Sequence, residues 1–285
     1  MSVKKEASGR RSVAVEVEVP GTPEEVWQAI GTGPGVSSWF MPTEIEERVG
    51  GAIKLAFGGR EAIARVIEWD PPRRLVGEAP GMTPGAPPMA TEWIVEARAG
   101  GTCVVRVVHS LFAATDDWDD QLEGTESGWP GFFRVLRLYL EEFKGQRSAS
   151  VQIMALTPLA PAKIWDTLVQ ALGLEGKPAG ARFRAAEGTP PLAGEVRRPG
   201  TRGDEQVLLL LDGPAAGIAR VGTISMGGAG VVLVTLYFYG DAAAAAAARE
   251  DAPWRAWIAR TFPPLAAPPP PQPCQPEPAS DETPR

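Results

Sequence analysis

One short motif occurs twice in the chain and constrains its fold more than any other feature. The pattern Pro-x-x-(Val/Ile)-Trp-x-x-(Ile/Leu) spans residues 23–30 and occurs again at residues 161–168. Each copy follows a strand-like segment and begins with proline, which favours the first turn of a helix. Because 285 residues correspond to about two domains of roughly 150 residues each, the repeat predicts an internal duplication.

The first half has the pattern of an α+β domain over residues 12–145. Residues 12–19 alternate between apolar and polar side chains, as a half-buried strand does. Residues 129–143 place aromatic and leucine side chains at helical spacing, which predicts a long amphipathic helix. Between them we expect short helices at residues 23–30 and 36–40, and strands at residues 43–49, 52–57, 61–69, 73–78, 91–97 and 102–112.

The second half repeats this order more loosely over residues 148–263. We expect strands at residues 148–156, 192–197, 205–211, 217–225 and 231–239, and a closing helix at residues 241–262. The glycines at positions 222, 227, 228 and 230 precede a strand rather than a helix, so they predict a hairpin turn and no phosphate-binding loop. Residues 264–285 are proline-rich without apolar periodicity, which predicts a disordered or polyproline tail.

Scarce residue types exclude several functional classes. One histidine and two cysteines cannot build a zinc site of the usual kind, and we expect neither a metal nor a cofactor. Cys103 lies in a strand-like segment and Cys274 in the proline-rich tail, so we expect free thiols and a reducing compartment. The net charge of −7 disfavours a surface for nucleic acid.

The chain shows no segment that would direct it to a membrane. Residues 1–11 are polar and lack the apolar stretch of a signal peptide. The longest apolar runs, residues 207–211 and 231–239, fall far short of the ~20 residues that span a bilayer. We therefore predict a cytoplasmic protein without membrane insertion.

The motifs of the first half resemble a known superfamily over about residues 13–144. They are similar to the START-like, or SRPBCC, superfamily, and specifically to the family homologous to the C-terminal domain of the heat-shock-protein-90 ATPase activator. The matching segments are residues 22–27, Trp39-Phe40, residues 66–76, residues 109–112 and residues 128–130. The second half matches only in its helix start and element order, which predicts a divergent second copy.

This resemblance implies a helix-grip fold, in which a curved antiparallel sheet wraps a long C-terminal helix and leaves a cavity. Members bind apolar or amphipathic small molecules, a few act as cyclases or aromatases, and eukaryotic relatives stimulate a chaperone ATPase. Those activators carry a further N-terminal domain, whereas 11 residues precede the first predicted strand here, which disfavours ATPase stimulation.

Strand alternation and helix spacing select the side chains that would face such a cavity. Glu92, Glu96 and Arg106 are expected to face water, so their neighbours along each strand face inward. The predicted ligand-binding residues are Trp39, Phe40, Trp93, Val95, Val107, His109, Trp129, Phe133 and Leu136. The alternative is that these side chains only fill the core, as buried aromatic residues usually do.

His109 is the one side chain that could titrate near neutral pH. It could act as a general base, but we favour a histidine satisfied by backbone or by Ser110 at the end of its strand. No Gly-x-Ser-x-Gly elbow presents a serine for a triad. The acidic residues at positions 116, 117, 119, 120 and 123 lack calcium-loop spacing, so we expect a solvated loop that favours the helix N-terminus.

These observations predict non-catalytic binding of a hydrophobic small molecule or lipid by the first half. The second half would then serve packing or contact with a partner protein. Two alternatives stay open: a co-chaperone-like interaction module, and a polyketide cyclase- or aromatase-like enzyme in which His109 or Tyr139 moves protons.

Overall fold

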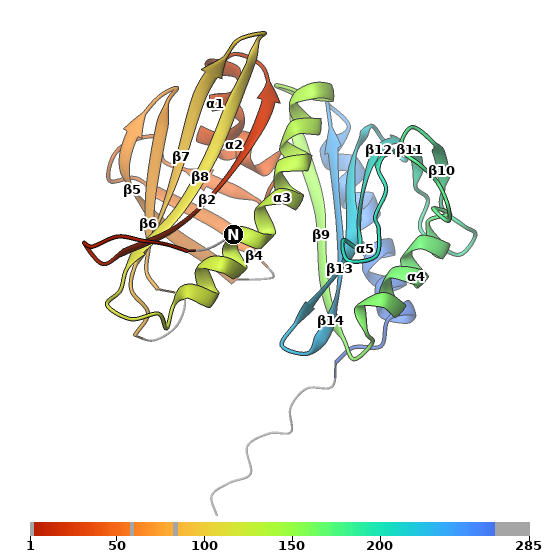
Figure 1. Ribbon diagram of the computed structural model, residues 1–285. Coiled ribbons are helices and arrows are strands. Elements are labelled where there is room, and N and C mark those ends of the chain that lie inside the picture. The colour runs from red at the N-terminus through yellow and green to blue at the C-terminus, as the bar shows by residue number, and fades with distance from the viewer. Residues whose placement is uncertain (1–2, 58–59, 82–84, 266–285) are drawn as a thin grey trace, which may run out of the picture.

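The chain folds into two antiparallel sheets, each covered by a long helix (Figure 1). The computed structural model describes residues 3–57, 60–81 and 85–265. Within these residues the first sheet has eight strands and the second has six. The order of strands and helices in each half confirms the predicted α+β class.

The first sheet is ordered β1-β2-β8-β7-β6-β5-β4-β3, so the first long strand pairs with the last and the others form a meander. Helices α1 and α2 follow β2, and α3 closes the half. The elements are β1 (Lys4–Lys5), β2 (Arg10–Pro20), α1 (Pro23–Gly31), α2 (Gly33–Ser37), β3 (Thr43–Ile45), β4 (Ala52–Phe57), β5 (Arg60–Asp70), β6 (Arg74–Ala79), β7 (Met89–Arg98), β8 (Thr102–Phe112) and α3 (Asp119–Glu142).

The second sheet repeats this topology in the order β10-β11-β12-β13-β14-β9, again with the first strand beside the last. Its helix α4 starts at the repeated proline motif, and α5 closes the half. The elements are β9 (Ser148–Thr157), α4 (Pro161–Ala171), β10 (Arg182–Arg184), β11 (Ala193–Arg198), β12 (Gln206–Gly213), β13 (Gly217–Met226), β14 (Ala229–Tyr239) and α5 (Ala243–Thr261). The shared topology is that of two helix-grip folds in tandem.

Local signals explain where the short helices begin. Thr22 accepts a hydrogen bond from the backbone of Glu25, whose side chain accepts one from Thr22, so a capping box starts α1. Thr32 then caps α2 through the backbone N–H of Gly35, which places this helix earlier than the predicted residues 36–40. The strand predicted at residues 43–49 is likewise shorter, because only Thr43–Ile45 pairs with β4.

Helix α3 begins ten residues before the predicted start at residue 129. Its first turns bury only Leu122 and Glu126, so they carry no apolar stripe that sequence could reveal. Leu122 packs against Val13 and Leu111 at the far end of the first sheet. The added turns therefore extend the helix along the whole inner face of the sheet.

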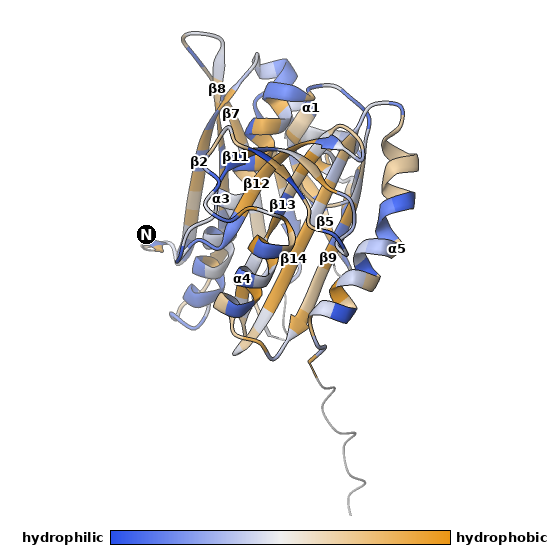
Figure 2. Cartoon of the chain, turned by 90° about the vertical axis from the view of Figure 1, so that its right-hand side faces the viewer, coloured by the Kyte–Doolittle hydropathy of each residue, from blue (hydrophilic) through white to orange (hydrophobic). Residues whose placement is uncertain are grey.

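Helix α3 lies between the two sheets (Figure 1). Phe133 and Leu136 face the first sheet, while Leu208, Ile218 and Tyr237 of the second sheet belong to the same hydrophobic cluster. The opposite face of the second sheet packs against α4 and α5 in a cluster of its own. The second sheet is thus covered on both faces, which explains why its central strands are hydrophobic almost throughout (Figure 2).

The domain limits 12–145 and 148–263 stay a prediction, although each sheet falls almost entirely within them. Apart from Pro264 and Leu265, the predicted tail at residues 264–285 lies outside the described residues. Among the helices of the described residues, none is long and apolar enough to cross a membrane.

Candidate functional site

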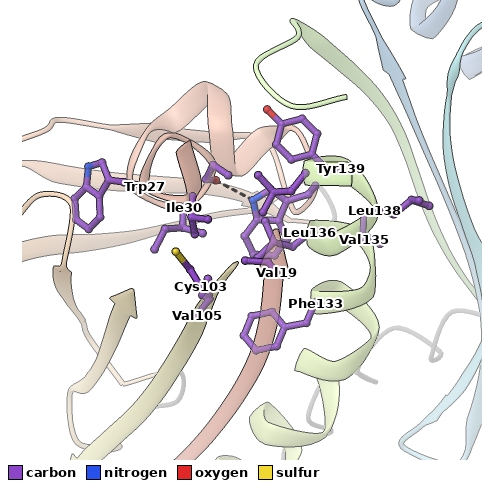
Figure 3. Packing of buried hydrophobic residues seen from close by; sticks show 14 of the residues in the cluster. Val19, Trp27, Ile30, Cys103, Val105, Phe133, Val135, Leu136, Leu138 and Tyr139 are labelled. Carbon is purple, nitrogen blue, oxygen red and sulfur yellow. Dashed lines mark hydrogen bonds between the residues drawn. The ribbon is translucent and has the colours of Figure 1, made fainter. Parts of the chain in front are cut away.

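The predicted ligand-binding residues come together in one aromatic cluster inside the first sheet. Trp129 is central: its ring centroid lies 5.3 Å from Phe40, 5.1 Å from Trp93 and 5.4 Å from Phe133. Val95, Val107 and Leu136 belong to the same hydrophobic core. Figure 3 shows the adjoining part of this core, where Phe133 and Leu136 point toward the first sheet and Leu138 points away from it.

Most of these side chains fill the core, but part of the cluster reaches solvent. Trp39 and Leu136 are fully buried, and Phe133 is 2% exposed. In contrast, Phe40, Trp93 and Phe132 pack against the core while remaining only partly buried. We call these three residues the aromatic edge. Phe40 and Trp93 belong to the predicted site, whereas the sequence analysis did not select Phe132. A ligand could reach these three residues without opening the core.

His109 is buried and uses both ring nitrogens within the protein. The indole N–H of Trp129 donates to His109 Nε2 at 2.7 Å, and Thr91 Oγ1 lies 3.0 Å from Nδ1. Because an indole nitrogen can only donate, Nε2 must be unprotonated and Nδ1 carries the hydrogen toward Thr91. Burial lowers the pKa of His109 to about 4, so the ring is neutral near pH 7.

This arrangement agrees with a satisfied histidine but corrects the expected partners. Trp129 and Thr91 hold the ring, not the backbone or Ser110. The strand register explains these partners. Thr91 of β7 is paired with His109 of β8, and Trp129 of α3 packs against both residues. With both nitrogens engaged, His109 has no free position for abstracting a proton from a substrate.

The second half holds the segment that carries Trp39 and Phe40. Tyr239 donates its hydroxyl to the Ser38 carbonyl at 2.7 Å, and Tyr237 donates to the Phe40 carbonyl at 2.7 Å. The Gln152 amide also donates to the Phe40 carbonyl, at 2.8 Å. We call this contact between residues 38–40, α3 and the second sheet the seam. Sequence reasoning missed it, because strands apolar on both faces show no alternation that would single out the tyrosines.

We expect Tyr239→Phe to lower the free energy of unfolding by about 1–2 kcal/mol, because the buried Ser38 carbonyl loses its donor. Chemical denaturation measures the change. Tyr139→Phe is the matched control: its hydroxyl accepts only a long 3.3 Å bond from the Gly145 backbone, inside the first half. Equal losses in the two variants would contradict a specific role for the Tyr239 hydroxyl.

Four arginines lie at the same seam, and three of them form ion pairs. Arg134 of α3 and Arg198 of β11 both bind Asp204, whereas Arg197 pairs with Glu141 and Glu142 of α3. The guanidinium carbon of Arg220 lies 4.2 Å from the centroid of the Phe132 ring, a cation–π contact. Burial lowers the pKa of Arg220.

Two pockets lie away from the predicted ligand-binding residues. One of about 300 Å³ is formed between α4 and the β11–β12 connection, with Trp165, Val169 and Val196 among its lining residues. A wider depression of about 580 Å³ lies beside β3 and β4, near Thr43 and Lys54. None of the nine predicted residues lines either pocket.

Two residues of the acidic stretch before α3 form ion pairs, which corrects the sequence interpretation in part, whereas Asp117, Asp120 and Glu123 are exposed as expected. Asp116 and Asp119 both bind Lys5 and Arg11, so they fasten the N-terminal strands to the start of α3. Hydrogen bonds from Lys5 and Arg11 hold the pKa of Asp116 below its ordinary value. Among the residues that the structure describes, no group of three or more potential ligands could hold a metal ion.

Other sequence expectations can be placed directly. Gly227 and Gly228 form the turn between β13 and β14 with positive φ, as a hairpin requires. Cys103 is a buried free thiol that donates to the Gly21 carbonyl at 3.3 Å. Cys274 lies outside the described residues.

The two sheets, each wrapped on a long helix with matching strand order, form two helix-grip folds in tandem. Residues 20–141 match the model of the family described as Activator of Hsp90 ATPase homolog 1-like protein. The match covers less than half of the chain and lies within its first helix-grip fold.

Several solved structures are similar to the chain. Protein MLL2253 from Mesorhizobium loti is 23% identical, with 47% of this chain and 98% of that chain covered and a TM-score of 0.42. The Aha1 protein from Colwellia psychrerythraea is 24% identical, with 47% and 98% covered and a TM-score of 0.39. The di-domain ARO/CYC protein BexL from the BE-7585A biosynthetic pathway is 18% identical, with 88% and 93% covered and a TM-score of 0.42. At these identities and scores the likenesses carry no information about ligand or activity.

No protein with a curated description matches the sequence.

Proposed function

We propose that the protein binds an apolar or amphipathic small molecule, without catalysis, at the aromatic edge of its first helix-grip fold. The observation that carries this proposal is the partial exposure of Phe40, Trp93 and Phe132 around the buried Trp129. Aromatic walls with few polar groups suit a ligand held by contact area rather than by many hydrogen bonds. A lipid or an aromatic metabolite fits this chemistry, and the proposal includes a cytoplasmic location.

The state of the candidate proton carriers supports binding over catalysis. His109 has both nitrogens in hydrogen bonds, and its neutral form is favoured by burial. Tyr139 is 4% exposed, and its ring stacks against Tyr239 with centroids 5.6 Å apart. A cyclase-like reaction would need one of these groups to reach a substrate. The co-chaperone-like alternative has support from the family description alone.

A neutral fluorescent probe, N-phenyl-1-naphthylamine, tests the proposed site in the full-length protein. We expect Trp93→Ala to weaken its binding about tenfold, because an aromatic wall of the aromatic edge is lost. Trp165→Ala is the matched control, since Trp165 lines the pocket beside α4 in the second half. Binding is measured by fluorescence titration at a temperature where both variants are folded.

The reverse pattern, with binding lost in Trp165→Ala and kept in Trp93→Ala, would place the ligand in the second half and overturn the proposal. Native mass spectrometry of protein purified from its own host identifies the natural ligand class. A bound lipid or aromatic metabolite at one per chain would agree with the proposal.

A further inference from the structure

We infer that the ligand carries an anionic group and that Arg220, a residue of the second half, binds this group at the seam. The inference rests on the proposed function for the apolar part of the ligand, and it adds the charge and the residue that recognises it. It also gives the second half a direct part in binding.

Arg220 is a half-buried cation that forms no ion pair within 4 Å among the described residues. Its Nε and Nη2 both donate to Gln206 Oε1, at 2.9 and 2.6 Å, and its guanidinium lies over Phe132. Among the described residues no carboxylate oxygen lies within 4 Å of this guanidinium, and Nη1 makes no hydrogen bond. A partly desolvated charge gains from a close ionic partner, because desolvation without one is costly. A ligand anion would supply the missing partner.

The surrounding charges favour an anion rather than another cation. Arg134 and Arg198 share the single carboxylate of Asp204, which attracts Arg220 only from beyond ion-pair distance. Positive charge therefore exceeds negative charge among these four residues. Arg197 differs, because two glutamates of α3 neutralise it. The excess positive charge beside Phe132 attracts anions in a partly desolvated setting.

Apolar surface adjoins the guanidinium on both sides of the seam. Phe132, which contacts Arg220, lies 4.5 Å from Phe40 between ring centroids, so the cation borders the aromatic edge. On the second sheet, Arg220 is paired in register with Thr235, which is paired with Gln152 of β9. Further along β9, Met154 and Leu156 are 37% and 42% exposed. An amphipathic anion matches this neighbourhood of one cation and exposed apolar side chains.

A glycine of α3 gives Arg220 the space it needs. A Cβ atom at Gly131 would lie 2.6 Å from Arg220 Nη2, so any larger residue must displace the guanidinium. A Cβ atom at Gly128 of the same helix would meet nothing within 4 Å. The pair Gly131→Ala and Gly128→Ala therefore separates displacement of Arg220 from a general effect of alanine in the helix.

The experiment compares two probes that share an aromatic framework. 8-Anilinonaphthalene-1-sulfonate carries a sulfonate, and N-phenyl-1-naphthylamine is its neutral counterpart. We expect Arg220→Met to raise the dissociation constant of the sulfonate probe about tenfold and to leave that of the neutral probe within about twofold. Gly131→Ala should also raise the dissociation constant of the sulfonate probe, by a smaller factor. Two control variants should leave the dissociation constants of both probes unchanged. They are Arg197→Met, which removes a neutralised arginine of the seam, and Gly128→Ala.

Thermal unfolding separates a binding role from a structural one. Because removal of a half-buried charge without a close ion pair relieves its desolvation cost, Arg220→Met should keep or raise the melting temperature. A marked fall in melting temperature, with both probes weakened equally, would assign Arg220 to packing and overturn the inference. Unchanged binding of both probes in Arg220→Met would overturn it while leaving the proposed function intact. Failure of the wild-type protein to bind either probe would overturn both.

Discussion

Replacement of Trp39 with alanine is expected to lower the free energy of unfolding by about 4 kcal/mol, the usual range for a large aromatic side chain deleted from a core. Trp39 is fully buried, and its ring lies 6.0 Å from Trp93 between centroids. Its indole nitrogen donates to the Ala29 carbonyl at 2.8 Å in a buried hydrogen bond. The variant therefore creates a cavity and also leaves a buried carbonyl without its donor.

Two further variants show which part of Trp39 matters. Trp39→Phe keeps most of the contact area but loses the hydrogen bond to Ala29, so a loss of about 1–2 kcal/mol is expected. Trp69→Ala removes a tryptophan of the same half that is only partly buried, and a smaller loss than for Trp39→Ala is expected. Urea denaturation measures the free energy of unfolding of the three variants and ranks their losses. If Trp39→Ala unfolded at the wild-type midpoint, Trp39 would not be a core residue.

Lowering the pH from 7 to 5 is expected to cost about 2 kcal/mol of stability through His109 alone. The folded-state pKa of this ring is about 4, because burial disfavours the charged form, whereas an unfolded chain has a histidine pKa of about 6.5. Below pH 6.5 the unfolded chain takes up a proton that the folded chain refuses. The contribution is therefore complete above pH 6.5 and is lost as the pH falls toward 4.

His109 is the only histidine of the chain, which makes the test unusually direct. Urea midpoints measured between pH 7 and 5 should decline in the wild type and stay nearly level in His109→Gln, a neutral replacement at every pH used. If the urea midpoints of the two proteins changed equally with pH, His109 would not be the buried, neutral ring described above.

Features set by neighbouring residues were predictable from the sequence. Strand β8 was predicted with its observed limits, residues 102–112, because alternation along a half-buried strand is visible locally. The inward set of Val107, His109, Trp129 and Phe133 follows from the same periodicities, and the structure gathers these residues in one cluster. Whether that cluster binds a ligand stays a prediction.

Partners that are distant in the chain were not predictable. The expected companion of His109 was Ser110, its neighbour in sequence, whereas its observed partners are 18 and 20 residues away. The acidic stretch before α3 looked solvated because its cations, Lys5 and Arg11, lie more than 100 residues earlier. Charge patterns show which groups need partners, but only the strand pairing decides which groups meet.

The sequence by itself determined the order of strands and helices in each half, the strand alternation and the aromatic character of the first interior, because each depends on residue types at short, regular spacing. The helix-grip fold was implied by the resemblance of the first half to a known family. Only the tertiary structure decided that the second sheet covers α3 and holds residues 38–40. The bond from Tyr239 to Ser38 joins residues 201 positions apart, and strands buried on both faces give no pattern that marks such a contact. The position of Arg220 likewise exists only because packing brings its guanidinium over Phe132 without a carboxylate within 4 Å in the described part of the chain.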